Sequence, residues 1–365
     1  MSISILVIGA GLIGGSVVKR LLQINGNPTS CIMPNAKFKI SIYDPFIDAD
    51  ALAYCESNGV LIYNPANFAN NAFDLAIIAV PPRVSLYKQI AAELNIFNLA
   101  KEVCELSSAK SWLLSLDGFK DAKNLIPLHP IAGKAQQGFA AADAELFIGK
   151  ELIYAPLHDK DGNAGITNLH KHPDVPQNNA ALVFIAIANN NIIRTMRADI
   201  HDIVFAICSH LPQLVSFALG VLFDKHPEFL QSLHPKLAKD FDNKQGFFRL
   251  CGSSRDLWQD IFAVNKPNIK HAAEHFAAEL CKKNILNATD LCLEISKMFN
   301  QMLQYGSSIE DDEDIFEKKI YKTIAKIHGT GFKTIISLAD CTLQSEDRTK
   351  NIATAFAKEL KEQIN

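Results

Sequence analysis

Short apolar runs alternate with helical patterns along the first half of this chain. The runs are continuous, which is typical of strands in a parallel sheet that helices cover on both faces. Six such strands are predicted, at residues 3–8, 38–43, 75–80, 103–106, 125–128 and 152–154. Helical periodicity between them, as at residues 14–23 and 84–94, predicts a doubly wound α/β domain.

The pattern changes after residue 180, where strand-like runs almost disappear. Long segments with helical periodicity follow, at residues 181–193, 201–223, 256–276 and 289–303. They predict an all-helical second domain. Residues 203–223 form the most membrane-like stretch, but they contain His210, Pro212 and Gln213, so a buried helix of a globular domain is the better interpretation.

Composition and charge narrow the classes of function. The 365 residues carry a formal net charge of −3 and no dense Lys/Arg cluster, which argues against nucleic-acid binding. The eight cysteines form no C-x-x-C pair, so we expect no zinc ribbon and no other bound metal. Scattered thiols, and an N-terminus that begins on a strand pattern without a basic leader, predict a cytoplasmic protein that binds no membrane.

A glycine-rich turn, Gly9-Ala-Gly11-Leu-Ile-Gly14, stands between the first predicted strand and the first helix. Gly9 permits a tight turn, Gly11 lets the backbone approach a pyrophosphate, and Gly14 lets helix and strand pack closely. The helix N-terminus then faces the phosphates. These glycines, with Leu12 and Ile13 between them, are the predicted cofactor-binding turn; the alternative is a turn that binds no ligand.

Two further strand ends are predicted to reach the same cofactor. Asp44 ends the second strand, where a carboxylate accepts hydrogen bonds from the adenosine ribose, although it could also simply start a turn before Pro45. Pro45 and Phe46 follow it, instead of an arginine that would favour a 2′-phosphate, so the predicted cofactor is NAD and not NADP. Val80 and Pro81 end the third strand, where the cofactor crevice should lie, although this proline pair could also simply form a turn.

A serine and a histidine follow the next two predicted strands. Ser108 comes after residues 103–106, and His129 comes directly after residues 125–128. Because the carboxyl ends of adjacent parallel strands converge on the nicotinamide end of the crevice, these side chains could hold and deprotonate a substrate hydroxyl during hydride removal. By itself, however, a histidine before a proline is more often a structural turn residue.

The helical half contains three further candidates. His210 follows Ser209 within an apolar helix and is either a site residue or a satisfied core group. Arg249 stands in a generally apolar segment and is either a carboxylate clamp or a surface arginine. The stretch His271-Ala-Ala-Glu-His275 matches a metallopeptidase pattern, but its amphipathic setting predicts a solvent-facing helix stripe.

Together these motifs resemble the prephenate and arogenate dehydrogenase family of tyrosine biosynthesis. The resemblance is carried by Pro127-Leu-His129-Pro-Ile-Ala-Gly133 with the stretch from Gly138-Phe to Tyr154-Ala-Pro156, by His201-Asp202 with Ser209-His210-Leu-Pro212, and by Arg249 with Leu257-Trp258-Gln-Asp-Ile-Phe262. The family implies a Rossmann domain followed by a helical dimerisation domain. Long apolar helices that one small domain would struggle to bury also predict a homodimer.

The predicted organisation has four parts. Residues 1–157 form the Rossmann domain, and residues 158–180, rich in His, Asp, Asn, Gly and Pro, form a linker or surface loop. Residues 181–305 form the helical substrate and dimerisation domain. Residues 306–365 are a C-terminal extension without a clear family match.

The resemblance implies NAD-dependent oxidative decarboxylation of prephenate to 4-hydroxyphenylpyruvate. It implies that His129 takes the proton of the ring hydroxyl with the assistance of Ser108, and that Arg249 and His210 bind the substrate, with Lys134 a further candidate beside the site. Three alternatives stay open: arogenate as the substrate, a non-catalytic NAD-binding protein, and a hydroxyacid dehydrogenase, which would need a catalytic lysine in the helical domain.

Overall fold

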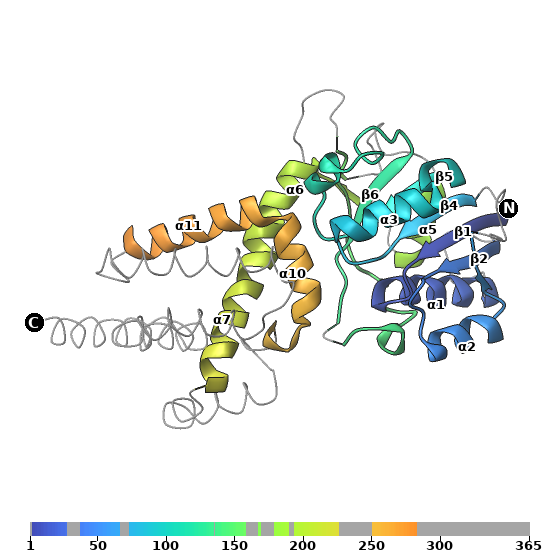
Figure 1. The fold of residues 1–365 in the computed structure, drawn as a ribbon, viewed down its shortest axis with the longest axis horizontal. Coiled ribbons are helices and arrows are strands. Elements are labelled where there is room, and N and C mark those ends of the chain that lie inside the picture. Colours follow the sequence, from blue (N-terminus) through green and yellow to red (C-terminus); the bar gives the residue numbers. More distant parts are fainter. Residues whose placement is uncertain are drawn as a thin grey trace, which may run out of the picture. The chain divides into compact units, whose positions relative to one another are not determined.

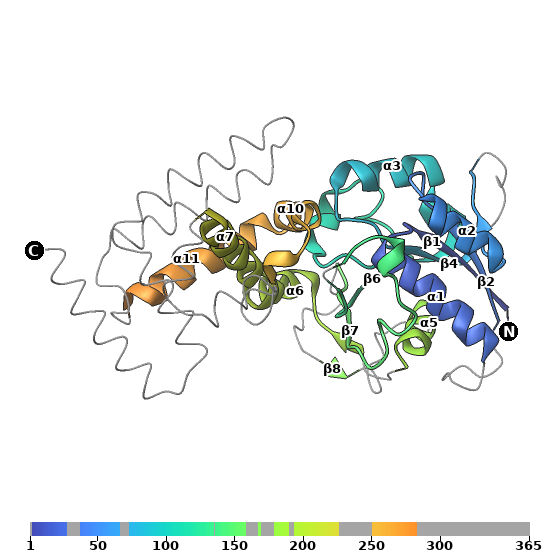
Figure 2. The same ribbon diagram turned by 90° about the horizontal axis from the view of Figure 1, so that it is seen from below.

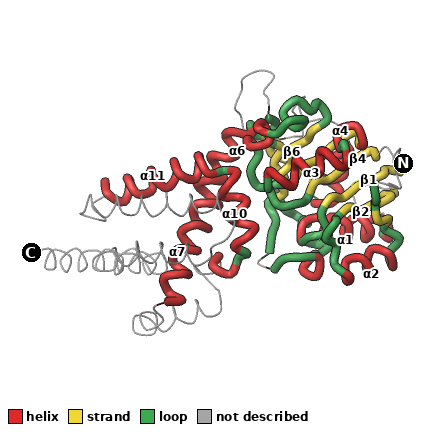
Figure 3. Tube along the Cα trace, in the orientation of Figure 1, coloured by secondary structure: helices red, strands yellow, loops and turns green. Residues whose placement is uncertain are grey.

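The structure is a computed structural model that describes residues 2–27, 37–65, 73–134, 136–157, 167–168, 179–189, 193–225 and 250–282. The chain divides into two compact units. The first is Met1–Phe205 with Ser254–Asn265, and the second is Ala206–Ser253 with Lys266–Asn365. The first unit contains the sheet, and the described part of the second is helical, as the colouring in Figure 3 shows.

Within the described residues, the first unit is built on a nine-stranded sheet in the order β3-β2-β1-β4-β5-β6-β7-β9-β8. The strands are β1 (Ser2–Ile8), β2 (Lys37–Tyr43), β3 (Leu61–Ile62), β4 (Phe73–Ile78), β5 (Ala100–Glu105), β6 (Leu125–Pro130), β7 (Leu152–Tyr154), β8 (Thr167–Asn168) and β9 (Ile193–Thr195). The strands from β3 to β6 pair in parallel, β6 and β7 pair antiparallel, and β9 pairs parallel to β7 and antiparallel to β8. The six predicted strands are confirmed.

Both faces of the sheet are buried, which explains the continuous apolar runs. In β1, Ile5 and Val7 lie in one core cluster, and Leu6 and Ile8 lie in another. Helices α1 (Leu12–Gly26), α2 (Ala49–Ser57) and α5 (Asn179–Ala188) contribute to the first cluster. Helices α3 (Val84–Leu94) and α4 (Ile96–Leu99) and the short helix η2 (Ser111–Ser115) contribute to the second, and Figures 1 and 2 show α1 and α3 on the two sides of the sheet.

One predicted helix differs from the structure. Residues 181–193 were expected to form one helix of the second domain, but α5 ends at Ala188 and packs beside α1, β4 and β5 in the first unit. Asn189 adopts a left-handed φ of 46°, which ends the helix, and β9 then joins β7 in the sheet. The strands β3, β8 and β9 have two or three residues each, too few to show a periodicity in the sequence.

The first unit also extends further along the chain than the predicted Rossmann domain. It includes α6 (Ala198–Phe205) and α10 (Arg255–Val264), whereas η5 (Ala206–His210), α7 (Leu211–Lys225) and α11 (Lys266–Lys282) belong to the second unit. The predicted helix 256–276 is thus divided into α10 and α11. Pro267 lies in the first turn of α11, where the absence of an N–H is tolerated.

One helical run among the described residues, Ala198–Ala218, is long and apolar enough to cross a membrane, judged by length and composition alone. Its buried residues include His201, Asp202, His210 and Gln213. Buried polar groups with protein partners are typical of the core helix of a globular domain, which passes the same test of length and composition.

The order of the strands determines where a ligand can bind. Strand β1 pairs with β2 on one side and with β4 on the other. The chain therefore leaves β1 and β4 toward opposite sides of the sheet, and in open sheets of this kind ligands bind at the carboxyl ends of two such strands. The glycine turn, Asp44 and the residues after β4 all lie at the edge of the sheet that the carboxyl ends of the parallel strands form.

Candidate active site

The turn from β1 to α1 has the backbone that its glycines predict. Gly9 has a φ of +100°, and a Cβ there would lie 2.7 Å from the carbonyl oxygen of Ala79. A Cβ on Gly14 would lie 1.9 Å from the carbonyl oxygen of Gly9, so helix and turn touch at this point. Both positions therefore exclude a side chain.

Gly11 differs from these two glycines because it faces open space. It is the N-cap of α1, and a Cβ there would meet nothing within 4 Å. The first turn of a 15-residue helix presents backbone N–H groups at this opening. Such a helix N-terminus without a capping side chain suits the pyrophosphate of a dinucleotide.

Asp44 lies beside the glycine turn at the end of β2. Its Oδ2 accepts a hydrogen bond from the backbone N–H of Ala10 at 2.7 Å, and its Oδ1 accepts one from the N–H of Phe46 at 2.8 Å. The carboxylate therefore forms the turn that the sequence left as an alternative. Each carboxylate oxygen retains a second lone pair, so these bonds are compatible with a ribose contact.

The other predicted cofactor residues border the same turn. Val80 lies so close to Gly9 that a Cβ on that glycine would be 2.8 Å from its Cγ1, and Pro81 follows it. Leu12 and Ile13 are partly buried and pack against the core. The structure thus brings the sequence-predicted cofactor residues together at one edge of the sheet.

Ser108 follows β5 at this edge, and His129 lies near the end of the neighbouring parallel strand β6, within the strand and not after it as the sequence predicted. The hydroxyl oxygen of Ser108 is buried and has no hydrogen-bond partner among the described residues. His129 is partly exposed and is the fifth residue of β6. An orphaned buried hydroxyl is unusual in a folded protein, and a bound ligand at this edge would provide its partner.

A chain of polar contacts leads from His129 into α6. Nδ1 of His129 lies 2.9 Å from Nε2 of His201, and Nδ1 of His201 lies 2.8 Å from Oδ1 of Asp202. The ring of Phe205 packs against both imidazoles, with centroid distances of 4.6 Å to His129 and 4.4 Å to His201. Burial lowers the pKa of His201 below its usual value, although the hydrogen bond to Asp202 acts in the opposite direction.

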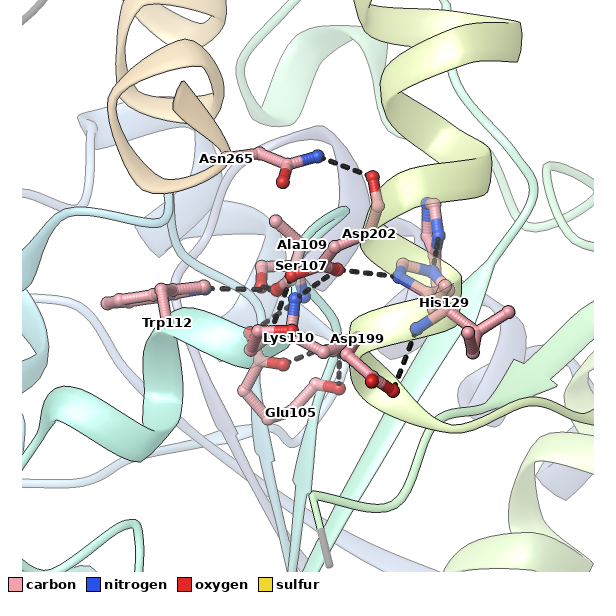
Figure 4. A network of polar contacts seen from close by, with 12 residues as sticks. Glu105, Ser107, Ala109, Lys110, Trp112, His129, Asp199, Asp202 and Asn265 are labelled. Atoms are coloured by element: carbon pink, nitrogen blue, oxygen red, sulfur yellow. Dashed lines mark hydrogen bonds and ion pairs between the residues drawn. The ribbon is translucent and has the colours of Figure 1, made fainter. Parts of the chain in front are cut away.

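Asp202 is held by the segment after β5. Its Oδ1 accepts from the backbone N–H of Lys110 and its Oδ2 from that of Ser111, both at 2.8 Å. The side chain of Asn265 donates to the backbone oxygen of Asp202 at 2.8 Å. Figure 4 shows this network, with Asp202 between Asn265 and the β5 segment.

A buried ion pair supports the same segment. Nζ of Lys110 contacts Oε2 of Glu105, and it also donates to the backbone oxygens of Glu105 at 3.0 Å and Leu128 at 2.9 Å. The other carboxylate oxygen of Glu105 accepts from the hydroxyl of Tyr87 at 2.6 Å and from the N–H of Ser107 at 2.8 Å. Burial, followed by the charge of Glu105, raises the pKa of Tyr87 well above its usual value. The pair ties the ends of β5 and β6 together beside Ser108 and His129.

The predicted substrate-binding residues are placed differently. Lys134 forms an ion pair with Asp143 at 2.7 Å on a partly exposed surface of the first unit. His210 is buried in η5 of the second unit, and Arg249 lies outside the described residues. His271 and His275 of the metallopeptidase-like pattern are exposed on α11, as a solvent-facing stripe requires.

The motif His201-Asp202 is visible in the sequence, but its functional role is not, because nothing in the sequence connects residue 201 to residue 129. A signal was nevertheless present. Adjacent histidine and aspartate at the start of an apolar helix are costly to bury without partners. The structure supplies those partners from β6 and from the segment after β5.

Two family models match this chain. "Prephenate dehydrogenase, nucleotide-binding domain" matches residues 39–171, and "Prephenate dehydrogenase, dimerization domain" matches residues 197–301. The two ranges together cover more than half of the chain. They agree with a sheet-containing part followed by a helical part.

Individual proteins that are similar to this chain are also named as prephenate or cyclohexadienyl dehydrogenases. Cyclohexadienyl dehydrogenase of Zymomonas mobilis is 26% identical over 317 residues, 85% of this chain and 97% of that protein. Prephenate dehydrogenase of Bacillus subtilis is 26% identical over 294 residues, 77% of this chain and 69% of that protein. The crystal structure of prephenate dehydrogenase from Aquifex aeolicus in complex with hydroxyphenyl propionate and NAD+ aligns with a TM-score of 0.55 at 23% identity, covering 83% of this chain and 96% of that one. The likeness to this last structure is one of fold.

Proposed function

This chain belongs to the prephenate dehydrogenase family, and we propose that it catalyses the NAD-dependent oxidative decarboxylation of prephenate to 4-hydroxyphenylpyruvate. The observation that carries the proposal is the placement of His129 and the orphaned hydroxyl of Ser108 on neighbouring strands, at the edge that holds the glycine turn. A non-catalytic nucleotide-binding protein would have no need of these two groups.

The residues of the crevice fit a dinucleotide. The open N-terminus of α1 at Gly11 would hold the pyrophosphate, and Asp44 would accept the ribose hydroxyls. When bound, NAD supplies the hydride acceptor. The matched nucleotide-binding model and the NAD+ in the Aquifex aeolicus structure support this choice of cofactor.

In the proposed reaction, His129 accepts the proton of the ring hydroxyl as the hydride leaves the same carbon. Loss of the ring carboxylate as CO2 returns an electron pair to the ring, and the phenolate oxygen of the aromatic product recovers a proton. Ser108 would hydrogen-bond the hydroxyl and hold it next to His129.

We propose that Arg249 binds a substrate carboxylate and that His210 lines the same site. The ion pair of Lys134 with Asp143 makes Lys134 the weakest of the proposed substrate ligands.

The decisive experiment measures NADH formation by the purified full-length chain with prephenate and with arogenate in parallel. We expect turnover with prephenate. Faster turnover with arogenate would assign the same chemistry to the other substrate. No NADH from either substrate, in protein that binds NAD, would exclude the proposed function.

We also propose that the chain acts as a homodimer in the cytoplasm. The match of residues 197–301 to a dimerization domain supports the dimer, and scattered thiols suit a reducing compartment. Light scattering on active protein at micromolar concentration should give about twice the chain mass of 40.2 kDa. A fully active monomer would contradict the proposed assembly.

A further inference from the structure

We propose that His201 and Asp202 are positioning residues that fix the imidazole of His129 in one tautomer, with its proton on Nδ1 and its lone pair on Nε2. The inference rests on the proposed function, because that lone pair is the base that accepts the hydroxyl proton. It follows from three successive contacts in the first unit, each of which determines the direction of the next hydrogen bond.

The first step is at Asp202. Its two carboxylate oxygens accept from the consecutive backbone N–H groups of Lys110 and Ser111, each at 2.8 Å. A carboxylate with these donors is an acceptor only. The remaining contact, between Oδ1 and Nδ1 of His201 at 2.8 Å, must therefore be donated by the histidine. Because Asp202 is nearly fully buried, water does not compete for this bond.

The second step is at His201. This side chain is fully buried, and burial lowers its pKa, so it is neutral at neutral pH and carries one ring proton. Asp202 places that proton on Nδ1, which leaves a lone pair on Nε2. The contact of 2.9 Å between this Nε2 and Nδ1 of His129 is then a hydrogen bond that His129 donates.

The third step is at His129. With its proton committed to Nδ1, the neutral ring has its lone pair on Nε2. Phe205 packs against both imidazoles and restricts the rotation of either ring. When Nε2 takes a proton, the charge on His129 is one hydrogen bond from His201 and two from the carboxylate of Asp202. The arrangement orients the base and stabilises its protonated form, as partners behind a catalytic histidine do in hydrolases.

The test is 15N NMR of the full-length chain labelled at its 11 histidines, without nucleotide or substrate, at neutral pH. The signals that disappear in His129→Asn belong to His129, and those that disappear in His201→Gln belong to His201. We expect Nδ1 to be protonated and Nε2 to be unprotonated in both rings. A proton on Nε2 of His129 in the neutral ring would overturn the inference.

Kinetics of paired variants provide a second readout. His201→Leu removes the acceptor for Nδ1–H of His129, and turnover should fall at least about tenfold with NAD affinity unchanged. His201→Gln retains an acceptor oxygen and should recover part of that loss. Asp199→Asn is the matched control, because Asp199 lies on the same helix (Figure 4) but is half-exposed and pairs with Arg197. Turnover of His201→Leu equal to that of the wild type would also overturn the inference.

Failure of this inference can be distinguished from failure of the proposed function. A wild-type chain with the expected tautomers that forms no NADH from either substrate contradicts the function only. An active chain with the opposite tautomer of His129 contradicts the positioning role only.

Discussion

Nδ1 of His129 lies 2.9 Å from Nε2 of His201, although 72 positions separate the two residues in the chain. The contact joins a strand end to the helix that begins at Ala198. It gives the proposed base a polar partner on the side away from Nε2. The proposed base is therefore part of a network and not an isolated strand-end histidine.

The first prediction is that His129→Asn and Arg249→Gln fail in different ways. In the proposed reaction, proton transfer to His129 matters most as the hydride departs, whereas the substrate carboxylate that Arg249 is proposed to bind is present in both the ground state and the transition state. His129→Asn should lower kcat by about a hundredfold or more with little change in KM. Arg249→Gln should mainly raise KM. If the ion pair between Arg249 and the substrate carboxylate is desolvated, its loss should weaken substrate binding by about 2–5 kcal/mol.

Steady-state kinetics of both variants, with NAD affinity measured by fluorescence, test this contrast. NAD binding should survive both changes, because neither residue belongs to the glycine turn. Near wild-type turnover in His129→Asn would contradict the proposal that His129 is the catalytic base.

The second prediction concerns cofactor choice. The negative charge of Asp44 beside the glycine turn should repel a 2′-phosphate, so kcat/KM should be higher with NAD than with NADP. Asp44→Asn keeps an oxygen acceptor but removes the charge. It should lower the ratio of kcat/KM with NAD to kcat/KM with NADP by about tenfold, or about 1.4 kcal/mol. Asp50→Asn, in the first turn of α2, is the control. Wild-type kcat/KM with NADP equal to or above that with NAD would be the contrary result.

The third prediction separates two glycines of the same turn. A methyl group at Gly14 would meet the carbonyl oxygen of Gly9 at 1.9 Å, so Gly14→Ala should destabilise the first unit as well as abolish NAD binding. Gly11→Ala meets no protein atom within 4 Å, so the free energy of unfolding should change by less than about 1 kcal/mol while NAD affinity falls. Chemical denaturation and NAD titration of both variants measure these effects. Unchanged NAD affinity in Gly11→Ala would show that the turn does not contact the pyrophosphate.

The fourth prediction concerns the buried pair of Lys110 and Glu105. Glu105→Gln leaves the buried ammonium of Lys110 without its charged partner, and it should lower the free energy of unfolding by about 3–5 kcal/mol. Glu102→Gln, a partly exposed position on the same strand, should change it by less than about 0.5 kcal/mol. Urea denaturation of the three proteins gives the comparison. Equal stability of the two variants would mean that the buried pair is not a major support of the β5 and β6 ends.

The sequence by itself determined the sheet and the nucleotide turn, because both depend on local patterns. A strand segment buried on both faces must be apolar at every position, as Ile5–Ile8 of β1 is, and a turn with a φ of +100° at Gly9 requires glycine. The short strands β3, β8 and β9 and the end of α5 at Ala188 are not predicted, since so few residues show no periodicity.

Only the tertiary structure determined which residues support His129, the proposed base, through hydrogen bonds. The burial that lowers the pKa of His201 and the backbone donors that orient Asp202 come from segments far away in the chain. A hydrogen bond between residues 72 positions apart leaves no pattern in a single sequence, because its geometry exists only once β5, β6 and α6 have packed together. The sequence determined which residues could perform the chemistry, and the packing determined which of them touch.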